Sequence, residues 1–278
     1  MTASSTIRPP AVAGLFYPAQ REVLSQNIKQ LLAAAPTDIP GGALVALVSP
    51  HAGYQYSGPT AACAFSLLQS RRFDVVVIVS PSHREYFDGI SIYDGKAYRT
   101  PLGDVMIDEE LRARLLLDDT IIESSQLGHG EEHAVEVQLP FLQSIMGEVS
   151  MVPIVMGDQR REYCLHLGEK LAAVLKGRKA LLIASTDLSH YHPHEIARNL
   201  DRIFIDDVAA FDCEGLMRNL ELERTEACGG GPTVAVLLAS RSLGADSVQV
   251  LHHCNSGDVT GEFNRVVGYL SAAVLQTN

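Results

Sequence analysis

The sequence predicts an α/β protein with three layers, in which helices (α) cover both faces of a central mixed, mostly parallel sheet (β). Three short runs of Val, Ile, Leu and Ala support this prediction: Ala43–Ser49, residues 75–80 and Ala180–Ser185. Because these runs do not alternate with polar residues, each is typical of a strand that is buried on both faces, as in parallel sheets. Stretches with helical periodicity lie between them, which is the order expected when helices cover both faces of a sheet.

The spacing of apolar residues predicts the other elements in chain order. Residues 8–18 are expected to be extended and residues 100–103 to turn. Helices are predicted over residues 21–35, 60–70, 108–117, 132–146, 163–176, 194–211 and 232–243. Further strands are predicted over residues 89–98, 149–156, 248–251 and 265–274. No shift in composition divides the chain, so residues 1–278 are expected to form a single domain.

Local signals support several of these helices. The helix over residues 21–35 stops before Pro36, and the acidic residues that open 108–117 suit the positive end of a helix dipole. Pro193 stands at the start of 194–211, where proline is favoured, and three glycines precede 232–243. Pro140 lies inside 132–146 and is expected to disturb that helix.

Composition excludes several classes of protein. The chain has 33 acidic residues against 22 Lys and Arg, a net charge of −11, which argues against nucleic-acid binding. Apolar runs fall well short of the roughly 20 residues that span a bilayer, so no membrane association is expected. The first 20 residues lack the pattern of a signal peptide, which predicts a cytoplasmic location. The five cysteines form no CxxC pair, so reduced thiols are expected.

Polar residues follow each of the three buried runs directly. His51 follows the first run, His83 follows the second, and Asp187 and His190 follow the third. Ligand sites in such sheets lie beyond the carboxyl ends of the strands, so these four side chains are expected to converge. Imidazoles together with a carboxylate are a typical set of metal ligands, so the sequence predicts a metal site at this edge of the sheet.

Six motifs occur in order over almost the whole chain: RPPAVAGLFYP at 8–18, SPHAGY at 49–54, SPSH at 80–83, EH at 132–133, STDLSH at 185–190 and NSGD at 255–258. Together they resemble the Memo family, also called the AmmeMemoRadiSam system protein B family. Residues 1–278 are therefore expected to form one Memo-like domain. The family is similar in fold to LigB-type class III extradiol dioxygenases, which implies a non-haem metal at the strand ends.

The resemblance also implies a set of metal ligands. It carries family metal or pocket positions over to His51, His83, Asp187 and His190. A cysteine near the carboxyl-terminal end completes the site in some family members, and the alignment puts Val259 there. The neighbouring Asp258 is therefore expected as the third ligand, with Cys254 as a weaker substitute. The implied cofactor is a metal ion, with Fe(II) expected first and Cu or Zn as alternatives.

Other residues are candidates for roles beside the metal. His190 is expected to act as an acid or base, because the pKa of histidine is near neutral. Asp187 either fixes the tautomer of a ligating histidine or caps the following turn. His133 belongs to the Glu-His motif and is a candidate pocket residue. His129 and His133 also match the zinc-hydrolase pattern HxxEH, but Gly128 and Gly130 argue against the helix that this pattern needs.

Two further positions are candidates for substrate binding. Tyr54, like Tyr56, either lines the pocket or packs the loop after His51. Gly230 lies in a glycine run before a predicted helix. Either free amides there hold an anion, or the glycines only let the backbone pass close to the pocket. Adjacent residues of a strand face opposite sides, so at most one of His252 and His253 is expected to face the pocket.

Two functions remain open from the sequence. The first is a mononuclear non-haem metal oxidoreductase, dioxygenase-like, that acts on a small substrate. The second is a non-catalytic module that uses the same pocket to bind a peptide or a small anion. The resemblance also implies a radical-SAM protein as a partner.

Overall fold

The computed structural model describes residues 6–36 and 41–278. It contains one large mixed sheet, whose main path runs in the order β1 (Ile7–Arg8), β5 (Ala97–Thr100), β6 (Gly103–Ile107), β8 (Ser150–Met156), β3 (Val75–Pro81), β9 (Ala180–Ser185), β2 (Ala43–Ser49), β12 (Val266–Gln276) and β10 (His190–His192). Off this path, β11 (Ser247–Asn255) pairs with β12, while β4 (Ile90–Tyr93) pairs with β7 (Ile122–Ser125) and β8. The predicted α/β class is confirmed.

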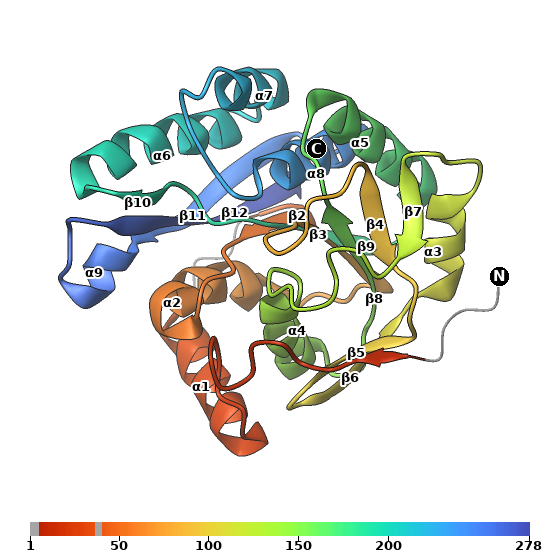
Figure 1. Cartoon of the computed structure of the whole chain (residues 1–278), viewed down its shortest axis with the longest axis horizontal. Helices are drawn as coiled ribbons and strands as arrows, with labels where there is room; N and C mark the ends of the chain where they lie inside the picture. Colours follow the sequence, from red (N-terminus) through yellow and green to blue (C-terminus); the bar gives the residue numbers. More distant parts are fainter. Residues whose placement is uncertain (1–5, 37–40) are drawn as a thin grey trace.

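Helices cover both faces of the sheet (Figure 1). One layer holds α1 (Arg21–Ala34), α2 (Tyr54–Phe65) and α4 (Leu139–Met146). The other holds α3 (Glu109–Leu116), α5 (Arg161–Leu175), α6 (His194–Ala209), α7 (Cys213–Glu221) and α8 (Gly230–Ser242). The short α9 (Ser256–Thr260) lies between β11 and β12. Each layer packs its apolar side chains against its own face of the sheet, which gives the molecule two hydrophobic cores.

The central strand β3 explains why the buried runs lack polar alternation. Val75, Val77 and Val79 enter one core, while Val76 and Ile78 enter the other. Successive side chains of a strand point to opposite faces, so a strand covered on both sides needs apolar residues at every position. The three runs that predicted the fold are neighbours, because β9 pairs in parallel with both β3 and β2.

Three element predictions were wrong in their bounds. Residues 89–98 form two strands, β4 and β5, because the chain turns at Gly95, where an added Cβ would collide with the Tyr93 ring. The helix predicted over 132–146 begins only at Leu139, so that Pro140 occupies its first turn, where proline is tolerated. Helix α2 begins at Tyr54, earlier than residue 60.

Other elements were not predicted. Strands β6 and β7 are short, and β7 is half exposed, so neither carries a clear periodicity. Helix α7 starts at an unnoticed cap, since the Asp212 carboxylate accepts the amide of Gly215. A search of the described residues finds no helix whose length and hydropathy would suit a bilayer crossing.

Candidate functional site

The site lies where β2, β3 and β9 end side by side. His51 follows β2 and His83 follows β3, and their ring centroids are 5.0 Å apart. Asp187 follows β9, and its Oδ1 accepts the amide of His51 at 2.8 Å. Because the three strands are parallel, their carboxyl ends open at one edge, which brings these residues together as the sequence predicts.

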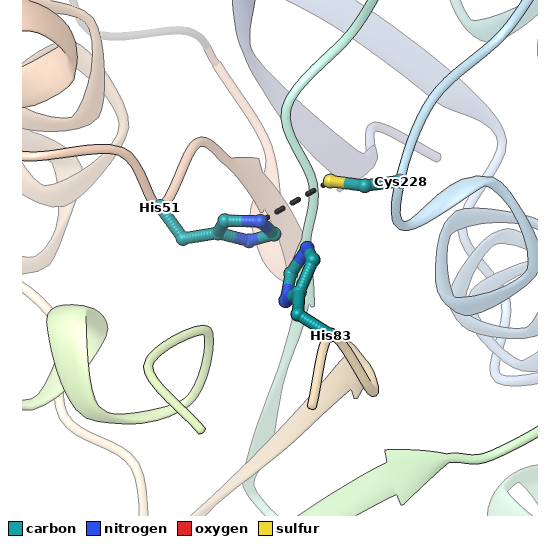
Figure 2. A group of neighbouring side chains, drawn as sticks. All are labelled: His51, His83 and Cys228. Carbon is teal, nitrogen blue, oxygen red and sulfur yellow. Dashed lines mark hydrogen bonds between the residues drawn. The ribbon is translucent and has the colours of Figure 1, made fainter. Parts of the chain in front are cut away.

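Cys228 completes this group. Its Sγ lies 3.2 Å from Nε2 of His51, and it projects from the segment just before α8 toward both imidazoles (Figure 2). One donor atom from each of His51, His83 and Cys228 lies within 4.8 Å of the other two. The segment can approach this closely because residue 229 is glycine, where a Cβ would collide with the carbonyl of Ser185 at the end of β9.

The hydrogen bonds around each ring fix which nitrogen faces the group. Ser185 Oγ donates to the carbonyl of Ala134, so it accepts from Nδ1 of His51 at 2.9 Å. The carboxylate of Glu132 accepts from Nδ1 of His83 at 3.0 Å. Both Nδ1 atoms therefore carry the proton, and the lone pair of each Nε2 is available. Imidazoles oriented in this way, with Nε2 facing a common point, are suited to binding a metal ion.

Glu132 holds the loop that carries His133 as well as the ring of His83. Its carboxylate accepts the backbone amides of His83, His133 and Ala134 at 2.6, 2.7 and 2.9 Å. Burial acts to raise the pKa of Glu132, but the hydrogen bond and charge of His83 outweigh it and lower that pKa to about 2. Glu132 is therefore a buried carboxylate anion that orients its neighbours.

The ring of His133 completes a cluster of three imidazoles. It stacks on the ring of His83 with 4.6 Å between the ring centroids, and its centroid lies 5.3 Å from that of His51. Together with His83 and Glu132 it forms a second group whose donor atoms are close enough for one ion. Burial lowers the pKa of His133 to about 4 and places the pKa of His51 well below its usual range. The rings of His51 and His133 are thus uncharged at neutral pH.

A cavity of about 770 Å³ opens onto the cluster. His190 and Asp187 line it beside the three imidazoles, as does Tyr56. Burial lowers the pKa of His190 and raises the pKa of Asp187 to about 7. The cavity therefore combines potential metal donors with the imidazole of His190 and with Asp187, a carboxyl that can exchange a proton near neutral pH.

The structure does not bring Asp258 to the cluster. Its Oδ2 accepts the amide of Asn255 at 2.8 Å in the capping box of α9, and its side chain lines a different cavity. Cys254 lies 3.2 Å from the Thr60 hydroxyl, also away from the cluster. The expectation of a third ligand near Val259 is corrected to Cys228. The sequence signal for this ligand is the cysteine directly before the glycine run.

The two expected substrate-binding positions also lie elsewhere. The hydroxyl of Tyr54 donates to the carbonyl of Val137 at 2.8 Å, and its buried ring packs on Phe141, so Tyr54 supports the loop while Tyr56 lines the cavity. Gly230 is the first residue of α8 and packs against Leu220 of α7. The neighbouring amides of Gly229 and Gly231 already donate to side-chain oxygens, so this helix start offers no anion site.

Four other histidines have partners outside the cluster. His129 is buried and shares a hydrogen bond with the hydroxyl of Tyr98, and residues 129–133 are not helical, so the zinc-hydrolase pattern lacks its geometry. The ring of His192 bonds Glu226, His194 bonds Asn255, and His252 bonds Thr60.

Comparison with known proteins gives a consistent result over nearly the full length. A family model described as "Memo-like protein" matches residues 8–273. A MEMO1 family protein of Methanopyrus kandleri is 38% identical over 273 residues, covering 94% of this chain and 96% of its own. Those of Methanocaldococcus jannaschii and Thermotoga neapolitana are each 39% identical, covering 96% of this chain and 99% of their own.

A solved structure shares the fold. The uncharacterized protein JW3007 of Escherichia coli K12 aligns with a TM-score of 0.54 at 16% identity, over 84% of this chain and 100% of its own. At that identity the likeness concerns the architecture alone.

Proposed function

This chain belongs to the Memo-like protein family, and from that premise we propose that it is a mononuclear non-haem metal oxidoreductase acting on a small substrate. The observation that carries the proposal is the meeting of His51, His83 and Cys228 beside the cavity, which the two histidines line. Three donors from distant parts of the chain, aimed at one point beside a ligand-sized space, favour a metal centre that substrate can reach.

The donor set fits a first-row transition metal. Donor atoms bound to one ion at about 2.0–2.3 Å lie roughly 3–4.5 Å apart, so small side-chain rotations suffice here. Imidazole binds iron, copper and zinc, and a thiolate in place of a carboxylate also suits the last two. Two histidines with one anionic ligand leave positions open, so bound Fe(II) would supply the binding and reduction of O₂ beside a substrate.

Residues around the donors support a catalytic assignment. His190 lines the cavity without belonging to either ligand group, so we assign it as the group that takes a proton from a substrate hydroxyl. Asp187 holds the His51 amide, and its carboxyl can store that proton. His133 stacks on His83 and presents a neutral ring to the same space.

Metal analysis and O₂ uptake test the proposal. Protein purified anaerobically with iron should carry about one metal ion per chain, measured by inductively coupled plasma mass spectrometry. The variants H51A, H83A and C228S should lose it, whereas C254S and D258N should keep it, because the structure places these two side chains away from the cluster. The metal-loaded protein should consume O₂ with an aromatic diol, and H190A should slow that reaction without loss of metal.

Two outcomes would overturn the assignment. Wild-type protein that stays metal-free, with a melting temperature unchanged by chelator, would remove the metal centre. Metal binding without O₂ uptake on any diol, combined with tight binding of a peptide or anion, would favour the non-catalytic module. That second function keeps the same cavity and loses only the redox step.

A further inference from the structure

One basic side chain stands in the cavity without a carboxylate partner. Arg265 is the single Lys or Arg among the lining residues, and no ion pair within residues 6–36 and 41–278 involves it. Two acidic residues, Asp187 and Glu262, share the lining, and neither is paired with this guanidinium. Arg265 is an exposed arginine at the lining of a ligand-sized cavity, and its guanidinium is available to an anionic group of a ligand.

The guanidinium has a defined seat. Its central carbon lies 5.1 Å from the centroid of the Tyr191 ring, and Tyr191 also lines the cavity. A guanidinium at this distance from a ring is attracted to it electrostatically, which restricts the positions that it takes. Its N–H donors therefore stay beside Tyr191 and are available to an incoming group.

The backbone holds the tyrosine ring in place at a strained residue. Tyr191 has a φ of 63°, in the left-handed region that bulky residues rarely adopt. Glu226 fixes both neighbours, since it accepts the His190 amide and the His192 ring, and β10 pairs with β12 directly after Arg265. With 62% of its surface exposed, Tyr191 gains little from burial, so core packing does not explain this conformation. Strain of this kind concentrates at functional positions.

We propose that the cavity binds a small molecule bearing a carboxylate. In this arrangement the Arg265 guanidinium, beside the Tyr191 ring, hydrogen-bonds the carboxylate. The opposite end of the molecule reaches the imidazole cluster. This inference rests on the proposed function in one respect, since that function says which end of the bound molecule reacts at the metal. A carboxylate matches the planar fork of a guanidinium through two parallel hydrogen bonds. The cavity volume of about 770 Å³ is within the range for small-molecule sites.

Binding of a charged and a neutral probe tests the proposal. The probes are 3,4-dihydroxybenzoate and its methyl ester, which keep the same diol and differ in charge. With iron-loaded wild-type protein under anaerobic conditions, calorimetry should give a dissociation constant about 10-fold or more lower for the carboxylate. R265Q should abolish that preference, and R265K should retain only part of it. R72Q, which removes an exposed arginine outside the cavity, should match the wild type.

The outcomes separate this inference from the proposed function. Three results would overturn the binding of a carboxylate by Arg265. They are equal affinity for the two probes, binding of neither probe, and a preference for the carboxylate that survives in R265Q. Metal content is measured on the same samples. If neither the wild type nor R265Q retains iron after loading, yet only the wild type prefers the carboxylate, binding of the carboxylate by Arg265 is supported. The proposed metal enzyme is then ruled out.

Discussion

The Nε2 atom of His51 lies 3.2 Å from the Sγ atom of Cys228, although 177 positions of sequence separate them. His51 presents a lone pair there, because its other nitrogen donates to Ser185. The thiol of Cys228 therefore donates to His51 in the metal-free protein. Burial raises the pKa of this thiol well above its usual range, which keeps it protonated at neutral pH. A metal ion must displace that proton in order to bind sulfur.

Metal binding is thus expected to release one proton from Cys228. Below the raised pKa of the thiol, each unit of pH increase should tighten the apparent affinity about tenfold, because the competing proton becomes scarcer. Calorimetry in two buffers of different ionisation enthalpy measures the release. C228S should abolish it, whereas C254S should leave it unchanged. A wild-type affinity that is independent of pH between 6 and 8 would contradict the expectation.

Removing the charge of Glu132 should weaken metal binding although this carboxylate is already engaged by protein donors. Its hydrogen bond to Nδ1 orients the ring of His83, so E132Q should reduce metal affinity by about 10–100-fold. The exposed neighbour provides the control, since E131Q should bind metal normally. Competition with a chromophoric chelator measures both. Equal affinities would show that His83 needs no partner.

The buried ion pair between Arg8 and Glu136 should dominate the attachment of the amino-terminal segment. Its atoms are 2.6 Å apart with almost no exposure, and Arg8 also donates to the carbonyls of His129 and Glu132. R8A leaves the buried Glu136 charge uncompensated and should cost about 3–5 kcal/mol of unfolding free energy. R99Q breaks the exposed pair with Asp104 and should change the unfolding free energy far less. Urea denaturation compares the two variants.

Asp201 should lower the unfolding free energy of the protein as pH rises from about 4 to 6. Burial raises the pKa of Asp201 from 3.8 to about 6. Between these values the folded state binds more protons than the unfolded state, so the unfolding free energy falls as pH increases. D201N should remove the contribution of Asp201 to this slope, leave that of Asp187, and gain on the order of 3 kcal/mol relative to wild type at pH 7 to 8. D206N, at an exposed position of the same helix, should keep the wild-type slope.

The sequence predicted the central sheet well because its signal is local. Strands β2 and β9 have the expected bounds, since a strand buried on both faces needs an unbroken apolar run. His51 and His83 followed from the same logic, because they come directly after such runs. The bounds of α2 and α4 were missed, since tertiary packing, rather than periodicity, sets where those helices begin.

The rest of the site could not be predicted for physical reasons. Cys228 comes from a loop before a helix on one face of the sheet, so no strand end pointed to it. Glu132 acts through backbone amides that only the folded loop brings together. Tyr54 and Tyr56 could not be separated in a loop, although the helix that begins at Tyr54 turns one inward and the other to the cavity. A cytoplasmic location, a radical-SAM partner and a single domain stay predictions.

The strand order has a consequence for when the metal centre can exist. Its donors follow β2 and β3, which are separated by β9 in the sheet, and the third donor precedes α8. No short fragment contains them all, so the ion can be loaded only after the long-range pairings of the sheet are made. Binding to the folded state alone then opposes unfolding by mass action, and a chelator should lower the melting temperature of the whole molecule. An ion at the proposed centre would therefore bind late, after the sheet has assembled, and the rate of that assembly would limit how soon it binds.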